Sequence, residues 1–280
     1  MYKALGIRWF LLLTVLPLAA GLIYALLYSL GLAGILGNGF TLAYWQSVFA
    51  EGVVWRSLGY SAYIATASMS LACLLALGLV IKLRTAFQKG ILSYVIYFPL
   101  AIPAMVAAFI SFQLLGKAGL FSRLTYALGL TESLQSFPDL VNDFWGIGII
   151  FSHSLMAFPF LLLLFLGTYE GERLGELKQI AKTLGAGEGY ISRKIVAPIL
   201  LKQNFAAILL YFIFVLGSYE IPLLLGREAP QMISVLTIRK LQRYDLLDKP
   251  EAYIIALIYC VLVLTAMVIS LRRSKILQKN

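Results

Sequence analysis

The sequence is poor in charged residues, although a soluble protein needs them to cover its surface. Asp, Glu, Lys and Arg make up 13% of its 280 residues, whereas a soluble domain carries roughly 25%. Hydrophobic residues make up 61%, and the mean hydropathy is +0.87. Most of the surface therefore cannot face water. This composition excludes an ordinary soluble globular protein and predicts an all-α membrane protein that crosses the bilayer several times.

Groups that bind metals or carry out catalysis are almost absent. The two cysteines, Cys73 and Cys260, lie inside separate apolar runs, which indicates buried thiols rather than a disulfide framework or a metal cluster. The one histidine, His153, has no carboxylate at helical spacing, which favours a packed or hydrogen-bonded side chain over a general base. The motifs G-x-x-x-x-G-K-[ST], H-E-x-x-H and G-x-S-x-G do not occur. We therefore predict a chain that is not an enzyme, with no metal site and no cofactor of its own.

Apolar runs long enough to cross a bilayer occur six times. A helical span needs roughly 20 mostly apolar residues, and the expected spans are 9–30, 58–81, 91–115, 145–167, 203–226 and 251–271. The first run has no clear small-residue cleavage site, so a retained helix is favoured over a signal peptide. Because no polar stretch is long enough for a core of its own, residues 1–280 are expected to form one transmembrane domain.

The connections between these spans differ in charge on the two sides of the membrane. Of the 23 lysines and arginines, 15 fall on the side of the N-terminus and eight on the other side, where eight acidic residues balance them. The positive-inside rule then places both termini and the connection 170–202 in the cytoplasm. The basic balance reflects membrane orientation and does not indicate a nucleic-acid partner.

The connections on the outer side carry short amphipathic segments. Residues 31–57 and 116–144 contain aromatic side chains, which are favoured at the membrane interface. Residues 227–250 contain Ile233, Leu236 and Leu241 at helical spacing. These connections are therefore expected to hold short helices rather than bare turns.

The longest charged interruption runs from Leu174 to Pro198. Apolar residues recur at helical spacing before Gly185, and Gly185 and Gly187 are expected to end that helix. A second short amphipathic segment follows, with Tyr190 and Ile195 among its apolar residues. A helix-turn-helix with an apolar ridge and a basic rim is suited to docking on a partner. The alternative is an amphipathic loop that rests on lipid headgroups.

Prolines interrupt three of the expected spans and indicate where the bundle departs from plain helices. Pro99 and Pro103 lie in the third span, Pro159 in the fourth and Pro222 in the fifth. A carbonyl freed by proline inside a membrane needs a neighbouring helix or a wet cavity to satisfy it. The prolines are therefore consistent with a pathway-lining bundle, and equally with kinked helix packing.

Glu220 is an acidic residue at the outer end of the fifth span, beside Ser218 and Pro222. An ionisable group at membrane depth costs a few kcal/mol and usually faces a cavity or a partner. One interpretation is a pathway or gate residue. The other is a carboxylate that reaches the interface and pairs with Arg227 or Arg239.

The cytoplasmic connection resembles the EAA loop of permeases from binding-protein-dependent ABC importers. In that pattern E-A-A is followed after three residues by G and, nine residues later, by I-x-L-P. Here Gln179-Ile180-Ala181 occupies the triplet, and Gly185, Ile195 and Pro198 follow at the same spacing. Three positions differ from the pattern: Gln179, Ile180 and Ala197. The loss of the acid puts in doubt any salt bridge that the family makes there. The segment FPLAIPAMVAAF also resembles the family's third span.

The resemblance implies a type I ABC-importer permease of six helices in the bacterial cytoplasmic (inner) membrane. Two permeases would form the pathway, the second more often a different chain than a second copy. Two cytoplasmic ATPase subunits would hold ATP and Mg²⁺, and each would receive one EAA loop. A periplasmic or lipid-anchored solute-binding protein would deliver the solute to the outer face, where 227–250 is a candidate contact. Substrates of the subgroup that GSYEIPLLLG resembles include polyamines, ferric iron, thiamine, sulfate and phosphonates.

The resemblance also assigns roles to particular residues. Gly185 would make the turn, and Gln179, Lys182, Ala186 and Tyr190 would contact the ATPase. Ala181, Ile195 and Pro198 belong to the same coupling motif. Pro103, Ser218, Glu220 and Pro222 are the candidate pathway residues. The alternatives are a secondary transporter or channel with its own coupling, which would carry more charges inside the membrane, and a membrane enzyme, which would carry clustered His, Asp or Cys.

Overall fold

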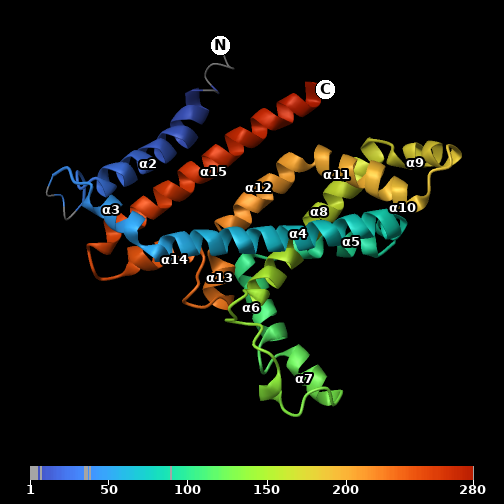
Figure 1. Cartoon of the computed structure of the whole chain (residues 1–280), viewed down its shortest axis with the longest axis horizontal. Helices are drawn as coiled ribbons and strands as arrows, with labels where there is room; N and C mark the ends of the chain where they lie inside the picture. The colour runs from blue at the N-terminus through green and yellow to red at the C-terminus, as the bar shows by residue number, and fades with distance from the viewer. Residues whose placement is uncertain (1–5, 7, 35–36, 38, 89, 280) are drawn as a thin grey trace. The chain divides into compact units, whose positions relative to one another are not determined.

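The computed structural model describes residues 6, 8–34, 37, 39–88 and 90–279, with side chains as far as Val268 except that of Gln88. All regular secondary structure in these residues is helical (Figure 1). The chain divides into two compact units, one built from Met1–Gly59 and Met232–Ile269 and the other from Tyr60–Gln231 and Ser270–Asn280. That residues 1–280 form one functional domain stays a prediction.

The first unit holds the N-terminal span, one outer helix pair and the start of the last span. Its elements are η1 (Leu11–Val15), α2 (Leu16–Ser29), α3 (Ala43–Ala50), the start of α4 (Gly52–Gln88), α14 (Ile233–Gln242) and α15 (Asp248–Lys279). The second unit continues α4 and holds the central helices. Its further elements are α5 (Leu92–Val95), η2 (Phe98–Ala101), α6 (Ala104–Leu115), α7 (Leu120–Ala127), η3 (Leu134–Ser136), α8 (Ile147–Gly171), α9 (Leu174–Thr183), α10 (Glu188–Ile191), η4 (Ser192–Val196), α11 (Ala197–Gln203), α12 (Phe205–Leu216) and α13 (Glu220–Leu225).

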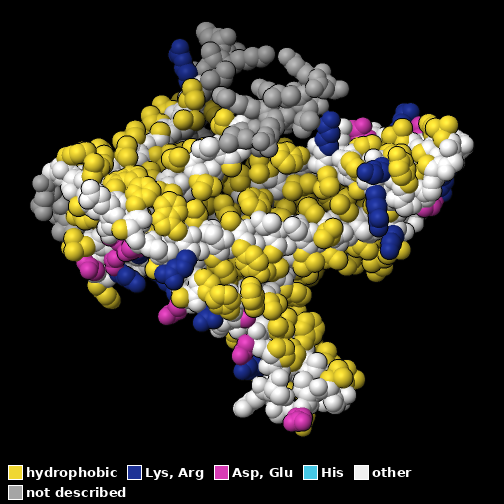
Figure 2. Space-filling model, in the orientation of Figure 1, with side chains coloured by type: hydrophobic (Ala, Val, Ile, Leu, Met, Phe, Trp, Pro, Cys, Tyr) yellow, Lys and Arg dark blue, Asp and Glu magenta, His cyan; other side chains and the backbone are white. Residues whose placement is uncertain are grey.

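By length and composition, five helices in the described residues can cross a membrane, and a sixth can if one bent pair counts as a single span. The five are Arg8–Ser29, Gly52–Phe87, Ala104–Ala127, Ile147–Gly171 and Asp248–Val268. Their apolar side chains face outward over much of the visible surface (Figure 2). An exposed apolar surface of this extent is what lipid, rather than water, covers. The chain is therefore a multi-pass membrane protein.

The third expected span, 91–115, is broken near its middle. A short helical stretch ends at Ala101, Ile102 is extended, and Pro103 caps the start of α6 with φ −61° and ψ 149°. Proline has no N–H and restricts the residue before it to extended conformations, so the helix cannot run through Ile102. The candidate membrane span of this region instead runs from Ala104 to Ala127, over α6 and α7. Hydropathy therefore predicted that a span lies in this region, and Pro103 determines that the helix α6 starts at Ala104.

The fifth expected span, 203–226, is interrupted at both ends. The helical run Glu188–Gln203 meets Phe205–Leu216 at a bend of 63°, with Asn204 between them. After α12 ends, Gly217, Ser218 and Tyr219 separate it from α13, which begins at Glu220. The expected span begins at residue 203, and the change of direction lies at Asn204, six residues after Pro198. Pro198 itself lies within the helical run Glu188–Gln203, two residues after the π-helical segment η4 ends.

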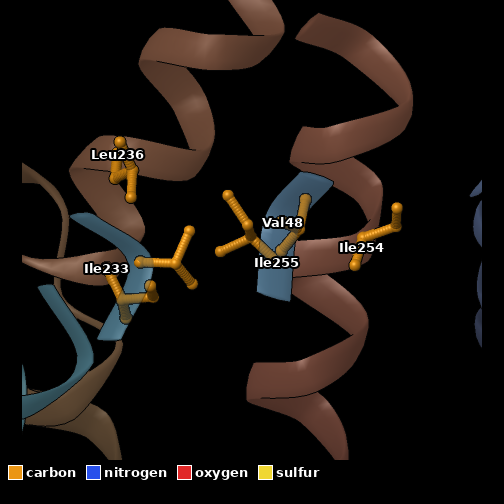
Figure 3. Close-up of a cluster of buried hydrophobic side chains, with 6 residues drawn as sticks. Val48, Ile233, Leu236, Ile254 and Ile255 are labelled. Carbon is orange, nitrogen blue, oxygen red and sulfur yellow. The ribbon is translucent and has the colours of Figure 1, made fainter. Parts of the chain in front are cut away.

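A hydrophobic cluster fixes the short helix α14 within the first unit. Ile233 and Leu236 of α14 pack with Val48 of α3 and with Ile254 and Ile255 of α15 (Figure 3). Each of these side chains is at most 4% exposed. The spacing expected in the outer connection 227–250 thus corresponds to a helix with its apolar face buried.

A charged group closes the edge of this cluster. Lys240, which is 5% exposed, contacts the carboxylates of Glu51 (3.1 Å), Asp248 (3.8 Å) and Glu251. Burial lowers the pKa of Lys240, but the hydrogen bonds to Glu251 and Glu51 outweigh it, so the pKa of Lys240 lies above its ordinary value. The lysine therefore stays charged and ties α14 to the ends of α3 and α15.

In the second unit, α6, α8 and α13 pack against one another (Figure 1). The buried face of α8 includes Leu161, Leu162 and Phe165, each 0% exposed. His153 on the same helix is 1% exposed, and its Nε2 has no hydrogen-bond partner in the described structure. The sequence favoured a packed or hydrogen-bonded histidine over a general base. His153 is packed, and its Nε2 makes no hydrogen bond within the described residues. The two cysteines are free and half-buried.

Candidate functional site

The connection 170–202 folds as two helical arms around a tight turn. The first arm is α9, and the second is the continuous helical run from Glu188 through Gln203, which contains the π-helical segment η4. Gly185 lies between the arms with φ +83°. An added Cβ at Gly185 would meet no atom within 4 Å, so only its backbone conformation requires glycine.

The turn is a Schellman motif, in which two backbone hydrogen bonds close the end of a helix. The N–H of Gly185 donates to the carbonyl of Lys182 (2.9 Å), and the N–H of Ala186 donates to the carbonyl of Ala181 (3.0 Å). The motif places Gly185 at its left-handed position, where a side chain is disfavoured. The turn predicted at Gly185 is therefore formed, and it has one defined geometry.

A bifurcated ion pair braces the two arms. The carboxylate of Glu188 at the start of α10 contacts the ammonium groups of Lys178 (2.7 Å) and Lys182, both on α9. Hydrogen bonds from Lys178 and Lys182 lower the pKa of Glu188 to about 2. Glu188 therefore remains ionised at physiological pH. The sequence placed the two lysines on the basic rim and gave no sign that an acid ten residues after Lys178 would bind both.

Buried apolar side chains hold the arms to the rest of the second unit. Leu174, Ile191 and Leu200 are 0% exposed, Val196 is 3% exposed and Ala181 is 9% exposed. At the base of the first arm, the guanidinium of Arg84 lies 4.7 Å from the centre of the Tyr169 ring. The connection is therefore a packed element rather than a flexible tether.

The same element also exposes large apolar side chains. Leu184 is 82% exposed, Tyr190 62%, Ile180 56% and Leu177 41%. Charged side chains gather around them at the end of the molecule where α9 and α10 lie (Figure 2). An exposed apolar group with a charged rim is typical of a docking surface. We refer to Leu177, Ile180, Leu184 and Tyr190 as the loop face.

The structure places the expected coupling residues in three settings. Gln179, Lys182 and Tyr190 are exposed, and Ala186 is half-buried. Ala181 is on the buried side of α9, whereas Ile195 is half-buried and Pro198 is exposed on the second arm. The surface includes Ile180 and Leu184, which the residue-by-residue comparison with the EAA pattern did not assign to contact. The sequence did show Ile180 and Leu184 as apolar residues on an otherwise charged helix, which is the pattern that could have identified them.

The expected pathway residues lie at the breaks of two helices. Pro103 is exposed immediately before α6, and Ser218 lies in the break before α13. Glu220 is exposed at the first position of α13, and Pro222 is buried two residues later. Because α6 and α13 pack against each other, the broken third and fifth spans meet in one bundle. The sequence analysis named Arg227 as a possible partner of Glu220. In the structure, the guanidinium of Arg227 lies 5.9 Å from the centre of the Phe144 ring.

The second arm also carries a polar contact that the sequence analysis did not identify. The hydroxyl of Thr168, near the end of α8, lies 3.1 Å from Oδ1 and 2.9 Å from Nδ2 of Asn204. No motif pointed to either residue, because the two are 36 positions apart and only the fold brings them together.

Residues 75–274 match the family described as "Binding-protein-dependent transport system inner membrane component". The chain belongs to this family. The resemblance stated for the coupling loop is confirmed by this match, which covers more than half of the sequence. The matched range includes the loop, the bend at Asn204 and both broken spans.

Curated relatives of this permease family are similar over part of their length. The chain is 27% identical over 221 residues to the thiamine transport system permease protein ThiP of Brucella abortus (strain 2308), which covers 75% of this chain and 38% of that protein. It is 32% identical over 123 residues to the probable ABC transporter permease protein y4fN of Sinorhizobium fredii (strain NBRC 101917 / NGR234), which covers 42% of this chain and 21% of that protein. The chain thus spans about two fifths of the length of the ThiP protein.

Solved structures share the fold over nearly the whole chain. A bacterial ABC transporter that imports the acidic polysaccharide alginate superposes with a TM-score of 0.69 at 17% identity, covering 98% of this chain and 94% of that chain. The alginate ABC transporter in complex with a periplasmic protein bound to an alginate pentasaccharide superposes with a TM-score of 0.70 at 18% identity, covering 100% and 95%. At this identity the likeness establishes the ABC-importer permease fold.

Proposed function

We propose that this chain is the transmembrane subunit of an ATP-driven importer in the bacterial inner membrane, and that the loop face docks on a separate cytoplasmic ATPase. The observation that carries the proposal is a rigid helical hairpin with an exposed apolar face. Leu184 and Tyr190 are more than half exposed at the tip, while Leu174 and Ile191 anchor the arms.

The rigidity of the hairpin supports docking on a protein rather than resting on lipid. An interfacial segment needs only an amphipathic helix. This hairpin has, in addition, a Schellman turn at Gly185 and an ion pair from Glu188 to Lys178 and Lys182. These features fix the angle between two short arms, which a moving partner requires and a lipid surface does not.

The mechanism assigns each part of the hairpin a mechanical role. The loop face, which includes Tyr190, contacts the ATPase together with Gln179, Lys182 and Ala186, and Gly185 sets the turn between the arms. Ala181, Ile195 and Pro198 hold the arms in position. ATP and Mg²⁺ bind to the ATPase subunits, two of which serve two permease subunits. Closure of the ATPase pair moves the two hairpins together and changes the pathway from inward-facing to outward-facing.

The pathway lies at the broken helices. The breaks before α6 and α13 leave backbone groups that a membrane interior tolerates only beside protein or water. We therefore assign Pro103, Ser218, Glu220 and Pro222 to the pathway. This chain forms half of it, and a second permease, favoured to be a different chain, forms the other half.

The outer connection offers a surface for a solute-binding protein. Tyr244 is fully exposed, and α14 beneath it is fixed by Ile233, Leu236 and Lys240. The solute is a small polar or charged molecule of the class that includes thiamine, polyamines, ferric iron, oxyanions and phosphonates. The similarity to a thiamine permease favours thiamine as the first solute to test.

Reconstitution tests this function directly. The chain, the ATPase and the binding protein encoded with it are placed in proteoliposomes, and uptake of radiolabelled thiamine, putrescine, ferric iron, sulfate and phosphonate is measured with and without MgATP. Uptake that needs MgATP, the ATPase and the binding protein is expected for one of these solutes. Uptake by the chain alone would instead identify a secondary transporter or channel.

A further inference from the structure

The 63° bend that ends the cytoplasmic hairpin is built around one buried side chain. Asn204 lies between the helical runs Glu188–Gln203 and Phe205–Leu216, with φ −100° and ψ 9°, and is 6% exposed. A bend of this size disturbs the backbone hydrogen bonds of the helix. In a membrane protein each disturbed carbonyl must find another partner.

The side chain of Asn204 adds hydrogen bonds at this bend and reaches a second helix at the same time. Its Nδ2 donates to the carbonyl of Leu200 (2.8 Å), one turn back on the second arm, and the same carbonyl also accepts the backbone N–H of Asn204 (3.2 Å). The same Nδ2 lies 2.9 Å from Oγ1 of Thr168, and that hydroxyl donates to Oδ1 of Asn204 (3.1 Å). One amide group therefore ties α8, α11 and α12 at a single point.

This contact joins the two ends of the hairpin. Thr168 lies three residues before the end of α8, and Asn204 lies one residue after the end of α11. All of the hairpin falls between them in the sequence. The fully buried Leu200 packs beside the same bend. The tip of the hairpin is thus braced by Glu188, and its two ends are tied together by Thr168 and Asn204.

We propose that Asn204 is a positioning residue, which passes displacement of the hairpin to α8 and α12 together through its contact with Thr168. This inference rests on the proposed function, since it concerns how motion of an ATPase reaches the pathway. Without the contact, the second arm can turn about the bend while α8 stays behind. The ATPase would then move the hairpin without moving both helices.

Distances between spin labels test this inference in the complex of the full chain with its co-purified ATPase. Cys73 and Cys260 are changed to Ser, and labels are placed at two exposed pairs of positions, Arg193→Cys with Leu155→Cys for α8 and Arg193→Cys with Leu210→Cys for α12. Each distance is measured by double electron–electron resonance, first without nucleotide and then after addition of MgATP and vanadate. No knowledge of the solute is needed.

The unsubstituted complex is expected to keep both distances when MgATP is added. In Asn204→Leu and in Thr168→Val, the fraction of molecules with a shifted loop-to-α8 distance after MgATP rises by about fivefold to tenfold, as the loss of one or two buried hydrogen bonds predicts. Thr168→Ser retains the hydroxyl and is expected to match the unsubstituted complex. The double variant Asn204→Leu/Thr168→Val is expected to equal the single variants because it removes the same contact.

The matched control is Thr66→Val, which removes an exposed hydroxyl that bonds only to the carbonyl of Ala62 in its own helix. Unchanged distances in Asn204→Leu and Thr168→Val would overturn the inference and leave the proposed function standing, as would an equal shift with and without nucleotide. If Asn204→Leu does not accumulate, Thr168→Val and Thr168→Ser decide the question. If no ATPase co-purifies with the unsubstituted chain, the proposed function itself fails.

Discussion

The ammonium nitrogen of Lys240 lies 3.1 Å from Oε1 of Glu51, although the two residues are 189 positions apart in the sequence. The same ammonium contacts Glu251, whose other oxygen accepts a hydrogen bond from Ser47 (2.5 Å). These bonds join α14 to α3 and α15 on the side predicted to face outward. They give α14 a fixed position, which the proposed contact of residues 227–250 with a binding protein requires.

Replacing Lys240 by Met is expected to destabilise the first unit by about 3 kcal/mol, because removing one partner of a buried pair leaves the others unpaired. Thermal unfolding of the purified chain in detergent measures the change. Arg243→Met is the control: its side chain is 62% exposed and contacts only Asp248 (3.3 Å). We expect less than about 1 kcal/mol for this exposed pair. Equal effects of the two substitutions would contradict a structural role for the buried contact.

The contribution of Lys240 should not depend on pH across the physiological range. Its pKa is raised in the folded chain, so the stabilisation is fully present below the ordinary lysine pKa of about 10.4 and is lost as pH rises through the folded value. The difference in melting temperature between the unsubstituted chain and Lys240→Met is therefore expected to be constant from about pH 6 to pH 9. A difference that shrinks within this interval would show that the lysine is not held charged.

The turn at Gly185 is expected to tolerate substitution less well than its neighbour. Gly185→Ala forces a side chain into φ +83° and costs about 1 kcal/mol. Gly187→Ala is the matched control, because Gly187 has φ −72° and an added Cβ there meets no atom within 4 Å. Affinity for the ATPase, measured by interferometry with the chain in nanodiscs, should fall in the first variant by roughly fivefold. It should stay unchanged in the second. Equal affinities of the Gly185→Ala and Gly187→Ala variants for the ATPase would contradict the prediction, because docking would then not depend on the geometry of the turn.

The ion pair at the tip is expected to protect the hairpin from proteolysis. Glu188→Gln removes the charge that holds Lys178 and Lys182. Trypsin should then cleave after Lys182 roughly two- to fivefold faster, as loss of an exposed ion pair permits. Glu172→Gln, an exposed acid outside the arms, is the control and should leave the cleavage rate unchanged. An unchanged rate in Glu188→Gln would mean that the brace does not restrain the arms.

Local patterns in the sequence predicted the helices and the turn, because the determinants are local. The apolar runs at 145–167 and 251–271 correspond to α8 and α15, and glycine at 185 corresponds to the left-handed turn. The breaks in the third and fifth spans were less predictable. Hydropathy averages over about 20 residues, so an extended Ile102 or a bend at Asn204 leaves the average unchanged.

The partners of buried polar groups could not be predicted from the sequence. Thr168 and Asn204 are separated by 36 residues, and Lys240 and Glu51 by 189. Each residue alone is compatible with an exposed loop. Their pairing depends on how distant helices pack, which no periodicity encodes. The exposed Ile180 and Leu184 were visible as apolar residues, but only the packed arms show which of the apolar positions are buried and which are not.

The most direct test of the account is the association of this chain with its ATPase after a change in the loop face. Leu184 is 82% exposed, so Leu184→Asp should leave thermal stability within about 0.5 kcal/mol of the unsubstituted chain. It should weaken ATPase binding at least about tenfold, because it places a charge in the centre of an apolar contact. Leu128→Asp, at a residue 73% exposed in the outer connection, is the control. Lost co-purification in Leu184→Asp alone is the predicted result, and full ATPase binding in that variant would contradict the account.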